Sequence, residues 1–145
     1  MYLHFPLIRT VSRFSESKLI EILKGENYHI INLNGKNIYD EITFFKEIVN
    51  QSLPLDPPLS LSGNVNYDAF NDSLWGGLSE ISSEKVALIW TDFNKMLDKG
   101  FNDFLQISDC IYTIAENLTH TEYGIDHEVE LKVFLLGEGK NFPTI

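Results

Sequence analysis

The sequence predicts one α/β domain, in which a small three-stranded parallel sheet packs with about four helices behind an N-terminal helical extension. Apolar residues recur at helical spacing in several segments, three short apolar segments are typical of strands, and helices separate those strands. Strands that alternate with helices imply right-handed crossovers and a parallel sheet. A chain of 145 residues is long enough for one domain with a sizeable core.

The predicted domain has three parts along the sequence: an N-terminal extension over residues 1–27, a core over residues 28–136 and a tail over residues 137–145. Apolar residues near helical spacing predict a helix from Ser15 to Lys24 within the extension. Ser15 has a residue type that is preferred as an N-cap.

The first half of the core is expected to form a strand, a helix and an irregular loop. An apolar segment over residues 28–33 predicts the strand, and residues 40–51 show the apolar spacing of a helix. Prolines and a glycine block regular structure over residues 52–66. The apolar stripe of the helix consists of Ile42, Phe45, Ile48 and Val49.

The second half begins with a short helix over residues 67–75, which Asn66 caps and Gly76 and Gly77 end. A continuous apolar segment over residues 86–90 predicts a strand that is covered on both faces. The remaining elements are a helix capped by Thr91 and stopped by Gly100, a longer helix with its stripe from Phe104 to Leu118, and a last strand over residues 129–136.

Acidic residues outnumber basic ones by 21 to 11, which gives a net charge of −10. Nucleic acids and anionic membranes are therefore poor partners, because binding to phosphates needs positive charge. A basic protein is the natural partner of such a field. The excess is concentrated between Lys46 and Lys85, where Arg and Lys are absent and the acidic residues are Glu47, Asp56, Asp68, Asp72, Glu80 and Glu84.

The short helix places two of these carboxylates together. Asp68 and Asp72 lie one turn apart, and at 100° per residue they share a face with Trp75, opposite Phe70 and Leu74. Like charges at this spacing cost a few tenths of a kcal/mol. The arrangement indicates a binding surface, and the alternative is a solvated helix face beside a half-buried tryptophan.

The same segment carries a recognisable motif, Gly63-Asn64-Val65-Asn66-Tyr67-Asp68-Ala69-Phe70-Asn71-Asp72-Ser73-Leu74 followed by Gly76. It resembles the signature of the barstar family of ribonuclease inhibitors, which is a glycine and then Asn-x-Asp-Ala-aromatic/Leu-x-Asp-x-Leu on the second helix. The resemblance extends from about Tyr28 to Leu136. It implies an intracellular inhibitor that blocks the active site of a basic ribonuclease in a one-to-one complex.

The resemblance also implies roles for single residues. Asp72 stands at the place of the family's central carboxylate, with Asn66 and Asp68 beside it, and Gly76 matches a position where the backbone approaches the enzyme. A carboxylate can occupy the place of the scissile phosphate among the Arg, Lys and His side chains of a ribonuclease.

Other positions depart from the family pattern. The loop aromatic before Gly63 would fall near Leu61, and the helix has Asn71 instead of tryptophan before Asp72. These changes suggest a different cognate enzyme, which is either a secreted ribonuclease or a nuclease toxin that bacteria deliver to one another. Loop 58–65 is expected to pack against the rim of the enzyme. The predicted partner-binding residues are Leu61, Gly63, Asn66, Asp68, Asn71, Asp72, Trp75 and Gly76, with Asp109 or Glu116 as a further acidic contact on the last helix.

Two other functions stay open at this point. One is an acidic interaction module for a different basic protein. The other is a hydrolase in which Asp68 and Asp72 act as acid and base, although such chemistry needs one acid in an apolar pocket. His120, Glu122, His127 and Glu128 fit no recognised metal spacing, so neither a metal nor another cofactor is expected.

The compartment follows from Cys110 and from the apolar segments. A single cysteine forms no internal disulfide, which fits a reducing compartment, and Cys110 is expected to pack in the core. No signal peptide or membrane span is recognisable. We therefore expect a soluble, cytoplasmic protein.

Overall fold

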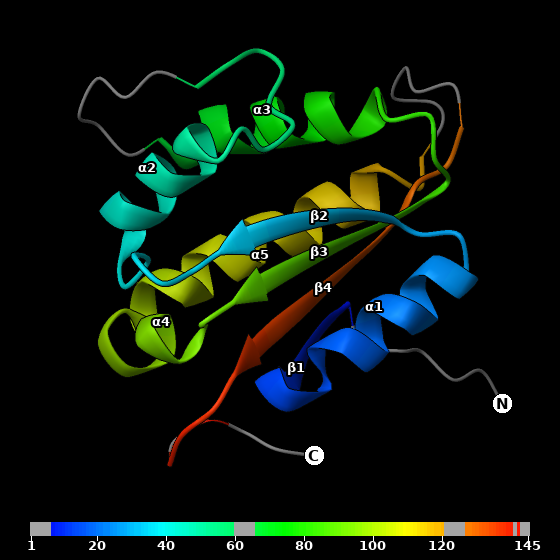
Figure 1. Cartoon of the computed structure of the whole chain (residues 1–145). Helices are drawn as coiled ribbons and strands as arrows, with labels where there is room; N and C mark the ends of the chain where they lie inside the picture. Colours follow the sequence, from blue (N-terminus) through cyan, green and yellow to red (C-terminus); the bar gives the residue numbers. More distant parts are fainter. Residues whose placement is uncertain (1–6, 60–65, 121–126, 141, 143–145) are drawn as a thin grey trace, which may run out of the picture.

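The computed structural model describes residues 7–59, 66–120, 127–140 and 142. In these residues, five α-helices and four strands follow one another along the chain (Figure 1). Their bounds are β1 (Ile8–Ser12), a 3-10 turn η1 (Arg13–Ser15), α1 (Glu16–Gly25), β2 (His29–Asn34), α2 (Glu41–Asn50), α3 (Tyr67–Ser79), β3 (Lys85–Thr91), α4 (Asn94–Lys99), α5 (Phe101–Asn117) and β4 (Glu130–Gly137).

The sheet is parallel throughout and has the order β1-β4-β3-β2. The prediction of a parallel α/β sheet is confirmed, but the prediction of three strands is wrong. The fourth strand, β1, pairs with β4 from Ile8↔Val133 to Ser12↔Gly137. Only two residues of β1, Ile8 and Val11, are strongly apolar. Its pairing partner lies more than a hundred residues away, so local periodicity does not reveal it.

Helices cover both faces of the sheet (Figure 1). The larger core lies between one face and helices α2, α3, α4 and α5, whereas α1 packs on the opposite face. Strand β3 contributes to both cores, because Leu88 and Trp90 face the larger one and Ala87 and Ile89 face the smaller one. The predicted burial of this strand on both sides is confirmed.

Two local expectations for the helices are wrong. Ile42 is 66% exposed, and Phe44 takes its place in the core with Ile48. A capping box between Asp40 and Thr43 starts this helix, and Phe44 and Ile48, one turn apart, form its buried face. Thr91 caps no helix, because it ends β3.

Aromatic packing holds α3 against the rest of the core. The ring of Phe44 lies edge-to-face with that of Phe70 on α3 and stacks on Trp90, with centroids 5.6 Å and 5.2 Å apart. The Tyr67 hydroxyl donates a 2.7 Å hydrogen bond to Glu41 on α2. These contacts fix the direction in which the other face of α3 points.

Among the described residues, no helix combines the length and the apolar character that crossing a membrane requires.

Candidate functional site

Helix α3 begins where the sequence predicts, because Asn66 caps it. The Asn66 side chain accepts a 3.0 Å hydrogen bond from the backbone N–H of Ala69. Phe70, Leu74 and Leu78 are buried at helical spacing and face the core. The opposite face of the helix therefore points toward solvent.

Asp68 and Asp72 are both exposed on that outer face. They lie one turn apart, and in the described part of the chain no lysine, arginine or histidine forms an ion pair with either carboxylate. No described cation therefore compensates their repulsion. The pair is available to positive charge from another molecule.

The helix does not end at Gly76 and Gly77, as the sequence predicted, but continues to Ser79. The backbone of Pro54 and Asp56 lies directly on the two glycines, and a Cβ atom on Gly76 would collide with the Asp56 carbonyl oxygen. The Asp56 N–H also donates a 2.8 Å hydrogen bond to the Ser73 carbonyl. The glycines thus permit close approach of a loop instead of terminating the helix.

This docking adds Asp56 to the acidic face. Residues 68, 72, 76 and 80 succeed one another at intervals of one turn, or about 6 Å along the axis. Gly76 has no side chain, and the backbone of Asp56 occupies the space that a side chain at residue 76 would fill. Glu80 follows one turn beyond Gly76. We call Asp56, Asp68, Asp72 and Glu80 the acidic row.

Asp56 and Glu80 are close enough to affect each other's protonation. A hydrogen bond between the two carboxyl groups, together with the negative charge of Asp56, raises the pKa of Glu80. Neither residue was among the predicted partner-binding residues. Glu80 lies two turns beyond Asp72 and a longer helix would have revealed it, whereas nothing local in the sequence places Asp56 there.

Asn71 and Trp75 differ from the acidic row because both are only partly exposed. Asn71 hydrogen-bonds to Cys110 on α5, and Trp75 packs against the larger core. The Asn71 Oδ1 and Trp75 Nε1 atoms are buried and have no hydrogen-bond partner among the described residues. These two side chains form the boundary between the acidic row and α5.

Cys110 is buried in the core, where it was expected to pack. Burial raises the pKa of its thiol, and the charges of Asp109 and Asp68 raise it further. A thiol in this state is a poor nucleophile.

The two acidic candidates on α5 lie in different places. Asp109 is exposed and, like Asp68 on α3, is near enough to Cys110 to act on its thiol. Glu116 instead lines a groove at the start of β3 and β4. Of the two, Asp109 is the sequence neighbour of Cys110, the α5 residue whose thiol Asp68 of α3 also affects.

Three further predictions have different outcomes. Leu61, Gly63 and most of loop 58–65 lie outside the described residues, although Leu59 packs on the larger core. Among the residues that the structure describes, no three His, Cys, Asp or Glu side chains gather as metal ligands, and Glu122 is outside them. Asp68 and Asp72 stand on an exposed helix face, whereas acid-base catalysis needs one carboxylic acid in an apolar pocket.

Comparisons with known proteins identify a family and similarities of fold among solved structures. Residues 28–135 match the family model described as Barstar (barnase inhibitor). A search of curated proteins finds no match. Among solved structures, the ORC2 protein of Aeropyrum pernix, solved as ADPNP-ADP complexes, matches 90% of this chain with a TM-score of 0.50 and 16% identity. The match spans about a third of that chain (34%) and shows a similarity of fold alone.

Proposed function

The chain belongs to the barstar family, and from this premise we propose that it inhibits a basic ribonuclease or nuclease toxin by blocking the active site. The observation that carries the proposal is the acidic row, whose exposed carboxylates Asp68 and Asp72 have no cationic partner among the described residues. In this role the protein is an inhibitor and not an enzyme.

The acidic row would act as a substitute for the phosphates of RNA. A nuclease gathers arginine, lysine and histidine around the phosphate it cleaves, and each carboxylate can accept charge-assisted hydrogen bonds from such groups. Asp72 lies in the middle of the row and would be the central anion. Asp68 on one side, and Asp56 with Glu80 on the other, would meet cations farther from the scissile position.

The other predicted contacts would border this row. Asn66 starts the helix, while Asn71 and Trp75 stand between the row and α5. Gly76 has no side chain and would let the enzyme approach the helix backbone closely. Leu61 and Gly63 would contribute contacts from the loop before the helix. Asp109 is the acidic contact that α5 would supply.

Electrostatic attraction would also speed the encounter. A net charge of −10, with the acidic row on one exposed face, attracts a basic protein over a distance of about one Debye length. The rate of association should therefore fall as salt is added. A partner that acts inside the cell, where an unpaired cysteine stays reduced, fits a cytoplasmic inhibitor or an immunity protein against a delivered toxin.

The proposal is tested by assaying basic ribonucleases and the nuclease domains of toxins against the full chain with a fluorogenic RNA substrate. Stoichiometric inhibition of one of them supports the proposal. An acidic module for another basic partner would bind that protein without inhibiting any nuclease, and substrate turnover without an added enzyme would indicate a hydrolase. Either result would overturn the proposal.

A further inference from the structure

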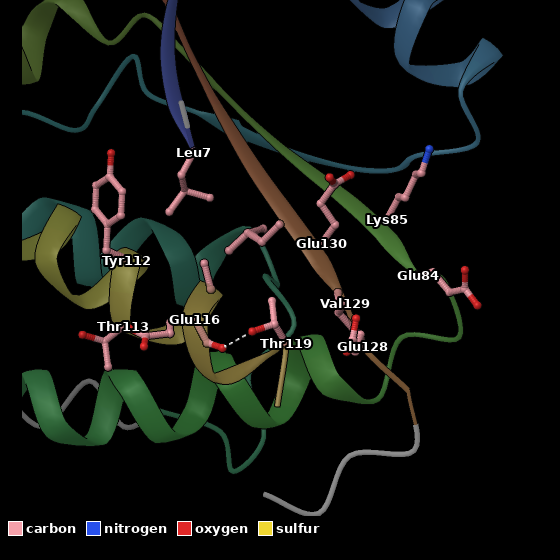
Figure 2. Close-up of a pocket in the computed structure, with 12 residues that line it drawn as sticks. Leu7, Glu84, Lys85, Tyr112, Thr113, Glu116, Thr119, Glu128, Val129 and Glu130 are labelled. Carbon is pink, nitrogen blue, oxygen red and sulfur yellow. Dashed lines mark hydrogen bonds between the residues drawn. The ribbon is translucent and has the colours of Figure 1, made fainter. Parts of the chain in front are cut away.

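A second surface lies at the C-terminal end of α5, away from the start of α3. It is an open groove of about 1180 Å³ between the C-terminal half of α5 and the first residues of β3 and β4. Figure 2 shows Tyr112, Thr113 and Glu116 on the α5 side and Glu84, Lys85 and Glu130 on the strand side. The acidic row contributes none of its residues to this groove.

In the part of the chain that the structure describes, the groove lies where the sheet has a step in its edge. Strand β4 begins at Glu130, but β1 joins it only at Ile8↔Val133, with the Leu7 carbonyl accepting a 2.8 Å bond from the Val133 N–H. Backbone groups of alternate residues in a parallel strand point to the same neighbour. The N–H and C=O of Leu131, two residues earlier, therefore point toward the groove.

The groove combines an apolar base with an acidic rim. Leu7, Ala115, Val129 and Leu131 supply apolar surface, and the half-exposed ring of Tyr112 stands at one side. Its described lining holds one cation, Lys85, and four carboxylates, which are Glu84, Glu116, Glu128 and Glu130.

One of the four carboxylates is held in place by the core. The Tyr28 hydroxyl donates a 2.6 Å hydrogen bond to Glu130, and the pKa of Tyr28 is raised by its burial and by this bond. Glu116 and Glu128 are exposed and have no ion-pair partner in the described part of the chain. Among the described lining residues, the four carboxylates thus outnumber the one cation, Lys85, and the core holds one of the four in place.

We propose that this groove binds a basic, extended peptide segment of a partner protein. An extended chain can hydrogen-bond to the Leu131 backbone groups and place alternate side chains on the apolar base and toward the carboxylates. Lysine or arginine at the outward positions complements the four carboxylates. This inference does not depend on the nuclease proposal, because the two surfaces share no residue.

The experiment is an NMR titration of the full chain with a six-residue peptide of alternating lysine and valine, capped at both ends. The expected result is a saturable change in the amide signals of Thr113, Glu116 and Leu131 that weakens as salt is added. A peptide of alternating glutamate and valine should leave these signals unchanged. No change with the basic peptide, or an equal change with the acidic one, would overturn the proposal.

Charge reversal separates the groove from the overall charge. The Glu116→Lys, Glu128→Lys double variant should weaken binding at least tenfold. The matched double variant Glu21→Lys, Asp98→Lys changes the net charge equally outside the groove and should stay within threefold of the unmodified protein. If the first variant fails to fold, Glu116→Gln alone should still weaken binding. Equal losses in both double variants, or signal changes centred on Asp68 and Asp72, would contradict the assignment.

Discussion

The carbonyl oxygen of Asp56 lies against the Cα of Gly76, in the space that a side chain at residue 76 would fill. This contact brings a loop residue, twenty positions earlier in the sequence, into line with Asp72 and Glu80. It also explains why two adjacent glycines occur inside α3 without ending it. Four predictions follow from this contact, from its neighbours and from the packing of α1.

The contact between Asp56 and Gly76 predicts that Gly76→Ala destabilises the protein. The added methyl group must displace the loop backbone, and overpacking of this kind costs about 1–3 kcal/mol. The free energy of unfolding in urea measures this loss. Gly25→Ala at the end of α1 is the matched control, because a Cβ there meets nothing within 4 Å. A Gly76→Ala variant as stable as Gly25→Ala would show that the loop does not rest on the helix.

The carboxyl pair predicts a pH-dependent gain in stability for Glu80→Gln. The pKa of Glu80 is raised in the folded protein, so the folded state binds a proton more tightly than the unfolded chain does. This contribution to stability is present below the unfolded pKa of about 4.3 and is lost as the pH rises through the folded pKa. Glu80→Gln should therefore raise the melting temperature at pH 7 and change it little at pH 4.

The effect of Glu80→Gln should depend on Asp56. In the Asp56→Asn background the carboxyl repulsion is already absent, so adding Glu80→Gln should bring a smaller gain at pH 7. Melting curves of both single variants and of the double variant measure this coupling. A decrease in melting temperature for Glu80→Gln at pH 7 would contradict the close approach of the two carboxyl groups.

The packing of α1 predicts that the N-terminal extension contributes to stability. Leu23 is 3% exposed and packs in the smaller core, so Leu23→Ala should cost about 2–5 kcal/mol. The neighbouring Ile22 is 48% exposed, and Ile22→Ala should cost much less. The two free energies of unfolding test whether α1 covers the second face of the sheet. Equal values would contradict that packing.

Much of the fold between residues 28 and 136 could be predicted from local patterns. Continuous or alternating apolar residues predicted β2, β3 and β4, and apolar residues at helical spacing predicted α2 and α5. What local patterns missed depends on distant contacts. The short strand β1 is stabilised by pairing with β4, and Phe44 enters the core instead of Ile42 because its ring packs on Phe70 and Trp90.

The candidate site shows the same division. The exposure of Asp68 and Asp72 and the cap at Asn66 were predicted from helix geometry, and both are confirmed. The contribution of Asp56 was not predictable, because it requires the loop to dock on Gly76. The partial burial of Trp75 agrees with the alternative reading of this helix, in which a half-buried tryptophan stands beside a solvated face.

The most direct test of the proposed function compares single-charge variants of the acidic row and of α1 in one nuclease inhibition assay. Asp72→Asn removes the central carboxylate of the row, whereas Glu21→Gln removes an exposed carboxylate from α1, on the other face of the sheet. Hydrogen bonds to charged groups contribute about 1.5–3 kcal/mol, so Asp72→Asn should raise the inhibition constant at least about tenfold. Glu21→Gln should leave it within threefold. Equal inhibition constants for the two variants would contradict the acidic row as the nuclease-binding surface.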